Sequence, residues 1–278
     1  MNTESEPLDE GHILKELKKE FESSFEWLIP GIIHNFSNPL SGIVSRSELL
    51  EEKTKKTSER IANNDFKEDD EIRQVCKTIN RDAGLIVREG DKLFGLFNDV
   101  TEKFQRLNDT ALKKINLSEL IRAEIDFFEF HPDVKHTITK SLTLDRGIPE
   151  VMGAKADYSF CLSAIFRHSI YLMKDSEPKE LVVSADYDDS YICVTIKDTG
   201  EPIAGKGEAV EDLDSLGSCI HNPDEEKGLF CALSLLKKYG VLFRITYESG
   251  FNVLLIRIPY WESEAGNYGC SNGQAETV

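Results

Sequence analysis

The chain has 278 residues, of which 40% are hydrophobic and 30% are charged, and its formal net charge is −17. This length and apolar content fit one large or two ordinary globular domains with real cores. Such an acidic chain is a poor match for nucleic acid or anionic lipid, which are bound through Lys and Arg side chains, and no apolar run approaches the roughly 20 residues of a membrane-spanning helix.

The ends of the chain and its cysteines point to a cytoplasmic protein. Residues 1–10 are polar and acidic, unlike a secretory signal peptide, and are expected to be disordered. The six cysteines are scattered without the close pairs that hold zinc. We therefore expect free thiols and no metal site.

Residues 11–110 are predicted to form an antiparallel hairpin of two long helices. Apolar residues recur every three or four positions on either side of a polar stretch at 53–70, as in Leu14, Leu17, Phe21, Phe25, Leu28 and Ile32, and again in Ile72, Val75, Ile79, Ile86, Leu93 and Val100. Pro30 and Pro39 lie within the first pattern and are expected to kink that helix. A two-helix hairpin cannot bury its apolar seam alone, so we expect a homodimer with a four-helix bundle. The alternative is that the hairpin packs on the second domain of its own chain.

Residues 115–262 are predicted to form an α/β sandwich. Asn116 or Ser118 is expected to cap a helix, and the patterns that follow predict a strand at 136–144, a helix at 158–173, strands at 181–185 and 191–196, a helix at 229–239, and a final strand pair at 243–247 and 253–258. Residues 199–227 are polar and rich in glycine, which predicts a loop. The tail at 263–278 is expected to be disordered.

One motif lies inside the first predicted helix. Residues 31–40 read Gly-Ile-Ile-His-Asn-Phe-Ser-Asn-Pro-Leu, which resembles the H-box of two-component sensor histidine kinases. The resemblance implies that His34 carries a phosphoryl group and that Asn38 orients water for dephosphorylation of a partner. Asn35 stands where the family has an acidic residue that acts as a base, and an amide cannot take a proton. Without the resemblance, His34 reads as a surface histidine near a proline kink.

The second domain resembles the GHKL-type ATP-binding domain of the same kinases. Residues 114–120 look like the start of that domain, Asp198-Thr199-Gly200 looks like its first glycine motif, and the segment that begins at Gly228 looks like its second. The resemblance implies that Asp198 receives an adenine amino group and that Gly200 and Gly228 line the nucleotide site. The alternative for Asp198 is an ordinary turn or cap residue.

The departures from the family pattern fall on the phosphate side of that site. His168 stands where the family has an Asn that holds Mg²⁺, and a hard cation prefers oxygen ligands. Pro202 and Phe230 replace glycines that lie close to the phosphates. The resemblance therefore implies a degenerate nucleotide site, for which we expect no bound cofactor.

Three functions are consistent with this sequence. The first is a phosphorelay protein that passes a phosphoryl group between His34 and aspartates on the receiver domains of response regulators, without binding ATP well. The second is an active cytosolic histidine kinase that phosphorylates His34 with ATP and Mg²⁺. The third is a non-catalytic dimeric docking module in which His34 is dispensable.

Overall fold

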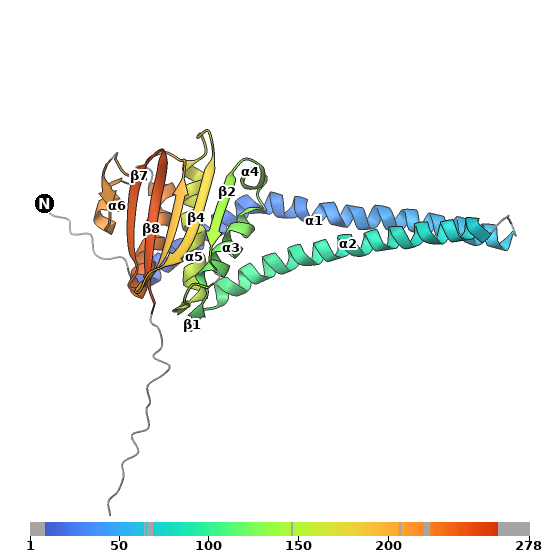
Figure 1. The fold of residues 1–278 in the computed structure, drawn as a ribbon, viewed down its shortest axis with the longest axis horizontal. Coiled ribbons are helices and arrows are strands. Elements are labelled where there is room, and N and C mark those ends of the chain that lie inside the picture. Colours follow the sequence, from blue (N-terminus) through green and yellow to red (C-terminus); the bar gives the residue numbers. More distant parts are fainter. Residues whose placement is uncertain are drawn as a thin grey trace, which may run out of the picture.

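Two long antiparallel helices extend from an α/β domain (Figure 1). The computed structural model describes residues 9–63, 65, 69–145, 147–205, 207–219 and 223–260. Helix α1 spans Glu10–Ala62 and helix α2 spans Asp69–Asn108, which confirms the predicted hairpin followed by an α/β sandwich. Of the ends that are expected to be disordered, only Asp9 and Glu10 lie within the described residues, and Glu10 already belongs to α1.

Helix α1 has two different packing partners along its length. It is assigned as one unbroken helix through Pro30 and Pro39. Its first half buries Ile13, Leu17 and Phe21 against α5 (Lys155–Leu172) and α7 (Pro223–Leu236) of the second domain, and its other half runs along α2. Much of the apolar stripe at 14–32 therefore packs on the second domain of the same chain, which was the alternative to a dimer seam, while Phe25 contacts Phe104 of α2.

The second domain is built on a six-stranded sheet with the order β2-β4-β5-β8-β7-β6. β2 pairs with β4 in parallel and the remaining neighbours are antiparallel. These strands are β2 (Thr139–Leu144), β4 (Glu180–Tyr187), β5 (Tyr191–Asp198), β6 (Ala209–Val210), β7 (Leu242–Glu248) and β8 (Phe251–Pro259). The inward residues of β5, such as Ile192 and Val194, are buried, and α5 packs on this strand while α7 packs on α5.

The remaining elements connect the hairpin to the sheet. They are β1 (Leu112–Ile115), which pairs with β3 (Val151–Ala154), the helices α3 (Leu117–Phe128), α4 (Pro132–His136) and α6 (Leu213–Cys219), and the 3-10 turn η1 (Lys237–Tyr239). Asn116 caps α3 as expected, since its side chain accepts a hydrogen bond from the Glu119 backbone N–H at 3.1 Å. Gly240 ends η1 with a φ of 71°, a conformation that glycine adopts without strain.

The structure differs from the sequence predictions in three places. The segment 199–227 is not a simple loop, because it contains β6, α6 and the first turn of α7. The short β1–β3 pair was not predicted at all, since four residues per strand carry no clear alternation. The strand predicted from residue 136 begins at Thr139, and His136 instead ends α4.

A fully buried ion pair joins the end of α2 to the second domain. The Lys103 ammonium contacts the Glu124 carboxylate of α3 and donates hydrogen bonds to Ser159 and Ser163 of α5 at 3.0 and 2.6 Å. Both serine hydroxyls in turn donate to Glu124, at 2.7 and 2.8 Å, and Arg106 forms an ion pair with the same carboxylate at 3.3 Å. Burial lowers the pKa of Lys103, and the neighbouring Glu124 carboxylate opposes this shift.

We predict that Lys103→Met strongly destabilises the fold. The variant leaves the Glu124 carboxylate buried without its main counter-charge, and breaking one half of a buried pair costs about 3–5 kcal/mol. The free energy of unfolding, measured by urea denaturation, should fall by this amount. The double variant Lys103→Met/Glu124→Gln removes the stranded charge and should recover part of the loss. A Lys103→Met variant as stable as the wild type would contradict this assignment.

Candidate functional site

The residues singled out by the sequence lie in two regions of the structure. His34, Asn35 and Asn38 are on α1, where His34 and Asn38 are exposed and Asn35 is half-buried. His168 is on α5, Asp198 and Gly200 are at the end of β5, and Gly228 is on α7. The two regions are described in turn.

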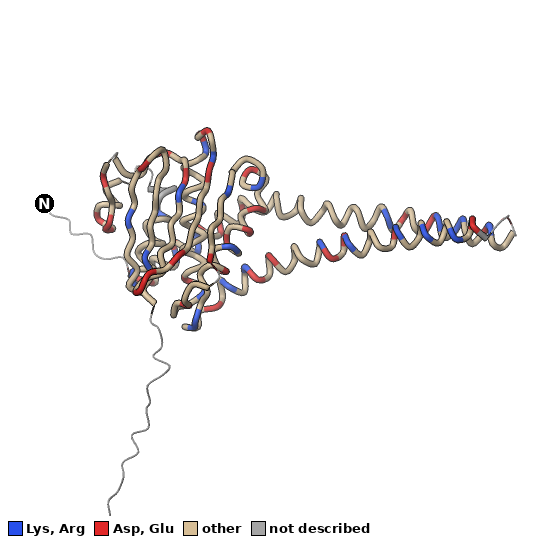
Figure 2. Tube along the Cα trace, in the orientation of Figure 1, with Lys and Arg blue, Asp and Glu red and all other residues tan. Residues whose placement is uncertain are grey.

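His34 lies in a long uncharged segment of α1. No Lys, Arg, Asp or Glu occurs between residues 27 and 45, which makes this part of the helix the plain stretch in Figure 2. Pro39 is buried and has no N–H to donate to the backbone carbonyl of Asn35, so one hydrogen bond of the helix is missing next to the histidine. The exposed imidazole is therefore accessible from solvent on a surface without charged neighbours along the helix.

Asn38 is the side chain that contacts the imidazole. Its Nδ2 lies 3.5 Å from Nδ1 of His34, one helical turn away, at the long limit of a hydrogen bond. A carboxamide can present either its NH₂ group or its carbonyl oxygen to a ring nitrogen. With the oxygen accepting from Nδ1–H, the lone pair of a neutral imidazole is on Nε2.

A close contact fixes α1 to the second domain one turn before His34. A Cβ atom at Gly31 would lie 1.9 Å from the carbonyl oxygen of Phe130, so only glycine allows the helix to approach the α3–α4 connection this closely. In the turn before it, the Trp27 indole stacks on His131 with ring centroids 3.6 Å apart. These contacts set the position of the His34 segment relative to the sheet.

The Asp198 carboxylate accepts hydrogen bonds from neighbouring groups of the same chain. Its Oδ1 accepts hydrogen bonds from the Gly200 backbone N–H at 3.0 Å and from Nδ2 of Asn252 at 2.9 Å. Asn252 also donates to the Glu201 carbonyl and accepts from the Ile203 N–H, so it ties β8 to the turn after β5. Burial raises the pKa of Asp198, and its hydrogen bonds oppose the shift.

Gly200 and His168 are both tightly enclosed. A Cβ atom at Gly200 would lie 2.4 Å from Cβ of Leu172, so the turn packs directly on the end of α5. His168 is buried, and neither of its ring nitrogens has a hydrogen-bond partner. Burial lowers the pKa of His168 to about 4, so the ring is neutral and cannot favour a nearby anion by charge.

Gly228 is covered by the first half of α1. A Cβ atom at Gly228 would lie 3.1 Å from Cγ of Glu20 and 3.6 Å from Cβ of Ala164 on α5. The Glu20 carboxylate pairs with Arg167 at 2.9 Å, and Glu16 pairs with Lys227 at 2.8 Å. Burial raises the pKa of Glu20, with Arg167 acting in the opposite direction.

All three nitrogens of the Arg167 guanidinium are engaged by groups of α1. Its guanidinium donates to the hydroxyls of Ser24 and Ser23 at 2.8 and 3.1 Å, in addition to the pair with Glu20. Carboxylates of α1 therefore lie beside the glycine that the resemblance assigns to the nucleotide site. Anionic side chains at this place repel an anionic ligand.

The residues that the structure describes do not fit magnesium triphosphate. Asp198 already has internal donors, His168 is a buried imidazole in place of an oxygen ligand, and Gly228 is covered by Glu20. In the described parts of the chain, no group of three or more His, Cys, Asp or Glu side chains is arranged to hold a metal ion.

Sequence reasoning missed three residues of this region. Asn252 carried a signal, because it is a polar residue at an inward position of a strand whose other inward residues are apolar. Glu20 and Arg167 carried none, since they are separated by most of the chain and meet only in the folded molecule.

The comparisons with known proteins concern structure alone. No protein-family model matches the chain, and no curated protein matches its sequence. No helix among the described segments is long and apolar enough to cross a membrane.

Several solved structures resemble the chain at low sequence identity. The catalytic domain of histidine kinase ThkA is 18% identical, with 54% of this chain and 95% of that chain covered and a TM-score of 0.44. The histidine kinase AdeS of Acinetobacter baumannii is 14% identical, with 81% and 97% covered and a TM-score of 0.41. The mycobacterial sensor histidine kinase MprB is 14% identical, with 54% and 97% covered and a TM-score of 0.40. All three of these solved structures are histidine kinases or parts of them.

We predict that the protein does not bind Mg·ATP at physiological nucleotide concentrations. The reason is the internal pairing of Asp198, the buried imidazole of His168 and the carboxylate beside Gly228. Calorimetric titration with a non-hydrolysable ATP analogue, with and without Mg²⁺, should give no saturable heat. Tight Mg²⁺-dependent binding would overturn this interpretation of the site and favour the kinase alternative.

Proposed function

We propose that this chain is a dimeric phosphorelay protein in which His34 accepts a phosphoryl group from an aspartyl phosphate on a receiver domain and passes it to another receiver. The observation that carries the proposal is the exposed His34 imidazole beside Asn38 on an uncharged helix face. The resemblance to kinases places the nucleotide phosphates near Gly228, but Glu20 and its ion pair with Arg167 lie there, which argues against ATP as the donor.

The transfer step needs only the ring of His34 and groups of the partner. The lone pair of a ring nitrogen attacks phosphorus, an N–P bond forms, and the P–O bond to the receiver breaks as the aspartate leaves as a carboxylate. No proton has to be removed from a neutral imidazole for this attack, so the amide of Asn35 is tolerable where a kinase has an acidic residue. As placed, Nδ2 of Asn38 faces Nδ1 at 3.5 Å; turning the amide so that its oxygen accepts from Nδ1–H would leave the lone pair of Nε2 for this attack.

Unpartnered apolar stripes on both helices of the hairpin support dimerisation. The stripes consist of Ile33, Leu40 and Val44 on α1 and of Val87, Phe94 and Phe97 on α2. Phe94 is 66% exposed, because α2 contacts α1 through its opposite face. Burying such a side chain contributes about 1.5–3 kcal/mol, which a second copy of the hairpin would supply.

We predict that His34 is the residue that becomes labelled. A receiver domain from the same cell, carrying labelled aspartyl phosphate, should transfer its label to the wild type and not to His34→Gln. The label should be acid-labile and base-stable, as expected for a phosphoimidazole. The matched control His136→Gln changes another exposed histidine, on α4, and should be labelled like the wild type.

Three outcomes would contradict the proposal. Undiminished labelling of a folded His34→Gln protein would place the chemistry elsewhere. Absence of labelling from every receiver, with wild-type protein of normal stability, would favour the docking-module alternative. Labelling of His34 by ATP alone would instead favour the kinase alternative.

We predict that Val87→Glu/Phe94→Glu dissociates the dimer. The two changes add charge to the exposed stripe of α2 and leave the contacts with α1 in place. Ile79 and Ile86 are less suitable positions for this test, because they are only partly exposed and also pack within the hairpin. Sedimentation should give a dimer for the wild type and a monomer for the variant. Gln74→Glu/Lys77→Gln adds the same negative charge at exposed positions outside the stripe and should remain dimeric. A wild-type monomer at micromolar concentration would refute the dimer.

A further inference from the structure

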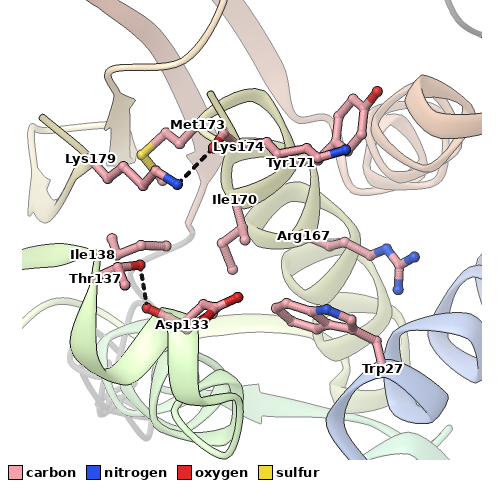
Figure 3. A pocket seen from close by; sticks show the side chains of 11 residues that line it. Trp27, Asp133, Thr137, Ile138, Arg167, Ile170, Tyr171, Met173, Lys174 and Lys179 are labelled. Atoms are coloured by element: carbon pink, nitrogen blue, oxygen red, sulfur yellow. Dashed lines mark hydrogen bonds between the residues drawn. The ribbon is translucent and has the colours of Figure 1, made fainter. Parts of the chain in front are cut away.

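A cavity of 280 Å³ lies where α1 meets α4 and the end of α5 (Figure 3). Its volume is just below the range of about 300–1,000 Å³ that is usual for small-molecule sites. Trp27 of α1 closes one end, α4 and the residues after it form one wall, and the last turns of α5 form the other. The cavity is separate from Asp198, Gly200 and Gly228, none of which lines it.

The middle of the cavity is apolar. Val134 of α4 lines the cavity. Ile138 approaches from the side of α4, and Ile170 and Met173 approach from the side of α5 (Figure 3). Trp27 is held in place by its stacking on His131. A ligand with an apolar body would bury its surface here against side chains that are already fixed by the fold.

Two lysines border the other end of the cavity on opposite sides, Lys179 near Met173 and Lys174 near Tyr171 (Figure 3). Lys179 donates a hydrogen bond to the backbone carbonyl of Lys174 at 2.7 Å, which leaves its remaining N–H bonds for a ligand. Within the part of the chain that the structure describes, neither lysine forms an ion pair with a carboxylate.

The other charged side chains that line the cavity are Arg167 and Asp133. Arg167 is already paired with Glu20. The Asp133 side chain is 77% exposed and turns toward the His131 ring, 3.9 Å away. An anionic group would therefore meet Lys174 and Lys179, while the apolar walls select against small inorganic anions.

We propose that this cavity binds a small amphipathic carboxylate. The apolar body lies between Trp27 and Ile170, and the carboxylate accepts hydrogen bonds from Lys174 and Lys179. Such a ligand would contact α1 on one side and the second domain on the other. Because Trp27 precedes His34 by seven residues, or about 10 Å along the helix, the ligand would act on the segment that carries His34. This proposal does not depend on phosphotransfer by His34.

The test uses the full chain with Trp261→Phe, which leaves Trp27 as the only tryptophan of the two in the sequence. Octanoate and 3-phenylpropanoate serve as aliphatic and aromatic probes, and 3-phenylpropanol serves as the uncharged counterpart. Trp27 fluorescence and calorimetry should both report saturable binding of at least one carboxylate. The alcohol should bind at least about tenfold more weakly, as expected when a charge-assisted hydrogen bond is lost.

Three variants locate the binding. Lys174→Gln/Lys179→Gln should weaken carboxylate binding by about tenfold or more, and should not affect the alcohol. Ile170→Trp should fill the cavity and abolish binding of both, which is measured by calorimetry alone because this change adds a second tryptophan. The matched control Lys197→Gln/Lys237→Gln removes two exposed lysines elsewhere and should bind like the parent protein.

Three results would overturn the proposal. They are no saturable binding of either carboxylate, equal binding of the alcohol and the carboxylate, or binding that survives both the lysine and the Ile170→Trp changes. If Ile170→Trp lowers the melting temperature strongly, the lysine variant alone decides, since both of its positions lie at the surface end of the cavity.

Discussion

The buried pair between Lys103 and Glu124 is the contact on which the arrangement of the molecule depends. It joins the last turns of α2 to α3 and α5, and the ammonium also lies 5.1 Å from the Phe21 ring of α1. Four helices therefore meet at one polar centre inside an otherwise apolar core. Ion pairs of this kind contribute little net stability, but they tolerate few alternative packings because any other arrangement strands a charge. The pair thus fixes where the hairpin leaves the α/β domain.

The first half of α1 has a second consequence for the same domain. Its apolar face packs on α5 and α7, and its carboxylates pair with Arg167 and Lys227. The groove that the resemblance to kinases assigns to nucleotide phosphates is thereby lined by groups of the chain itself. The same helix continues without interruption to His34. A single element therefore lies beside Gly228 and carries His34.

The sequence predicted those parts of the fold that depend on local periodicity. The two long stripes predicted the hairpin, alternation predicted most strands of the main sheet, and Asn116 announced the start of α3. It could not assign a partner to the stripe at 14–32, because an apolar face does not specify what covers it. Contacts such as those of Glu20 with Arg167 and of Trp27 with His131 join residues far apart in the chain and leave no local pattern. For the candidate site, the sequence showed the motif around His34. The hydrogen bond of Asn252 to Asp198 and the contact of Glu20 with Gly228 became apparent only from the structure.

The absence of charge between residues 27 and 45 bears on how a partner would recognise this protein. Most of the surface of so acidic a chain repels other acidic proteins at long range, and that repulsion is screened by salt. Around His34 the helix offers shape and apolar contact instead of a charge pattern. Discrimination between similar partners would then rest on how well two surfaces fit at short range, and less on attraction that guides them together from a distance.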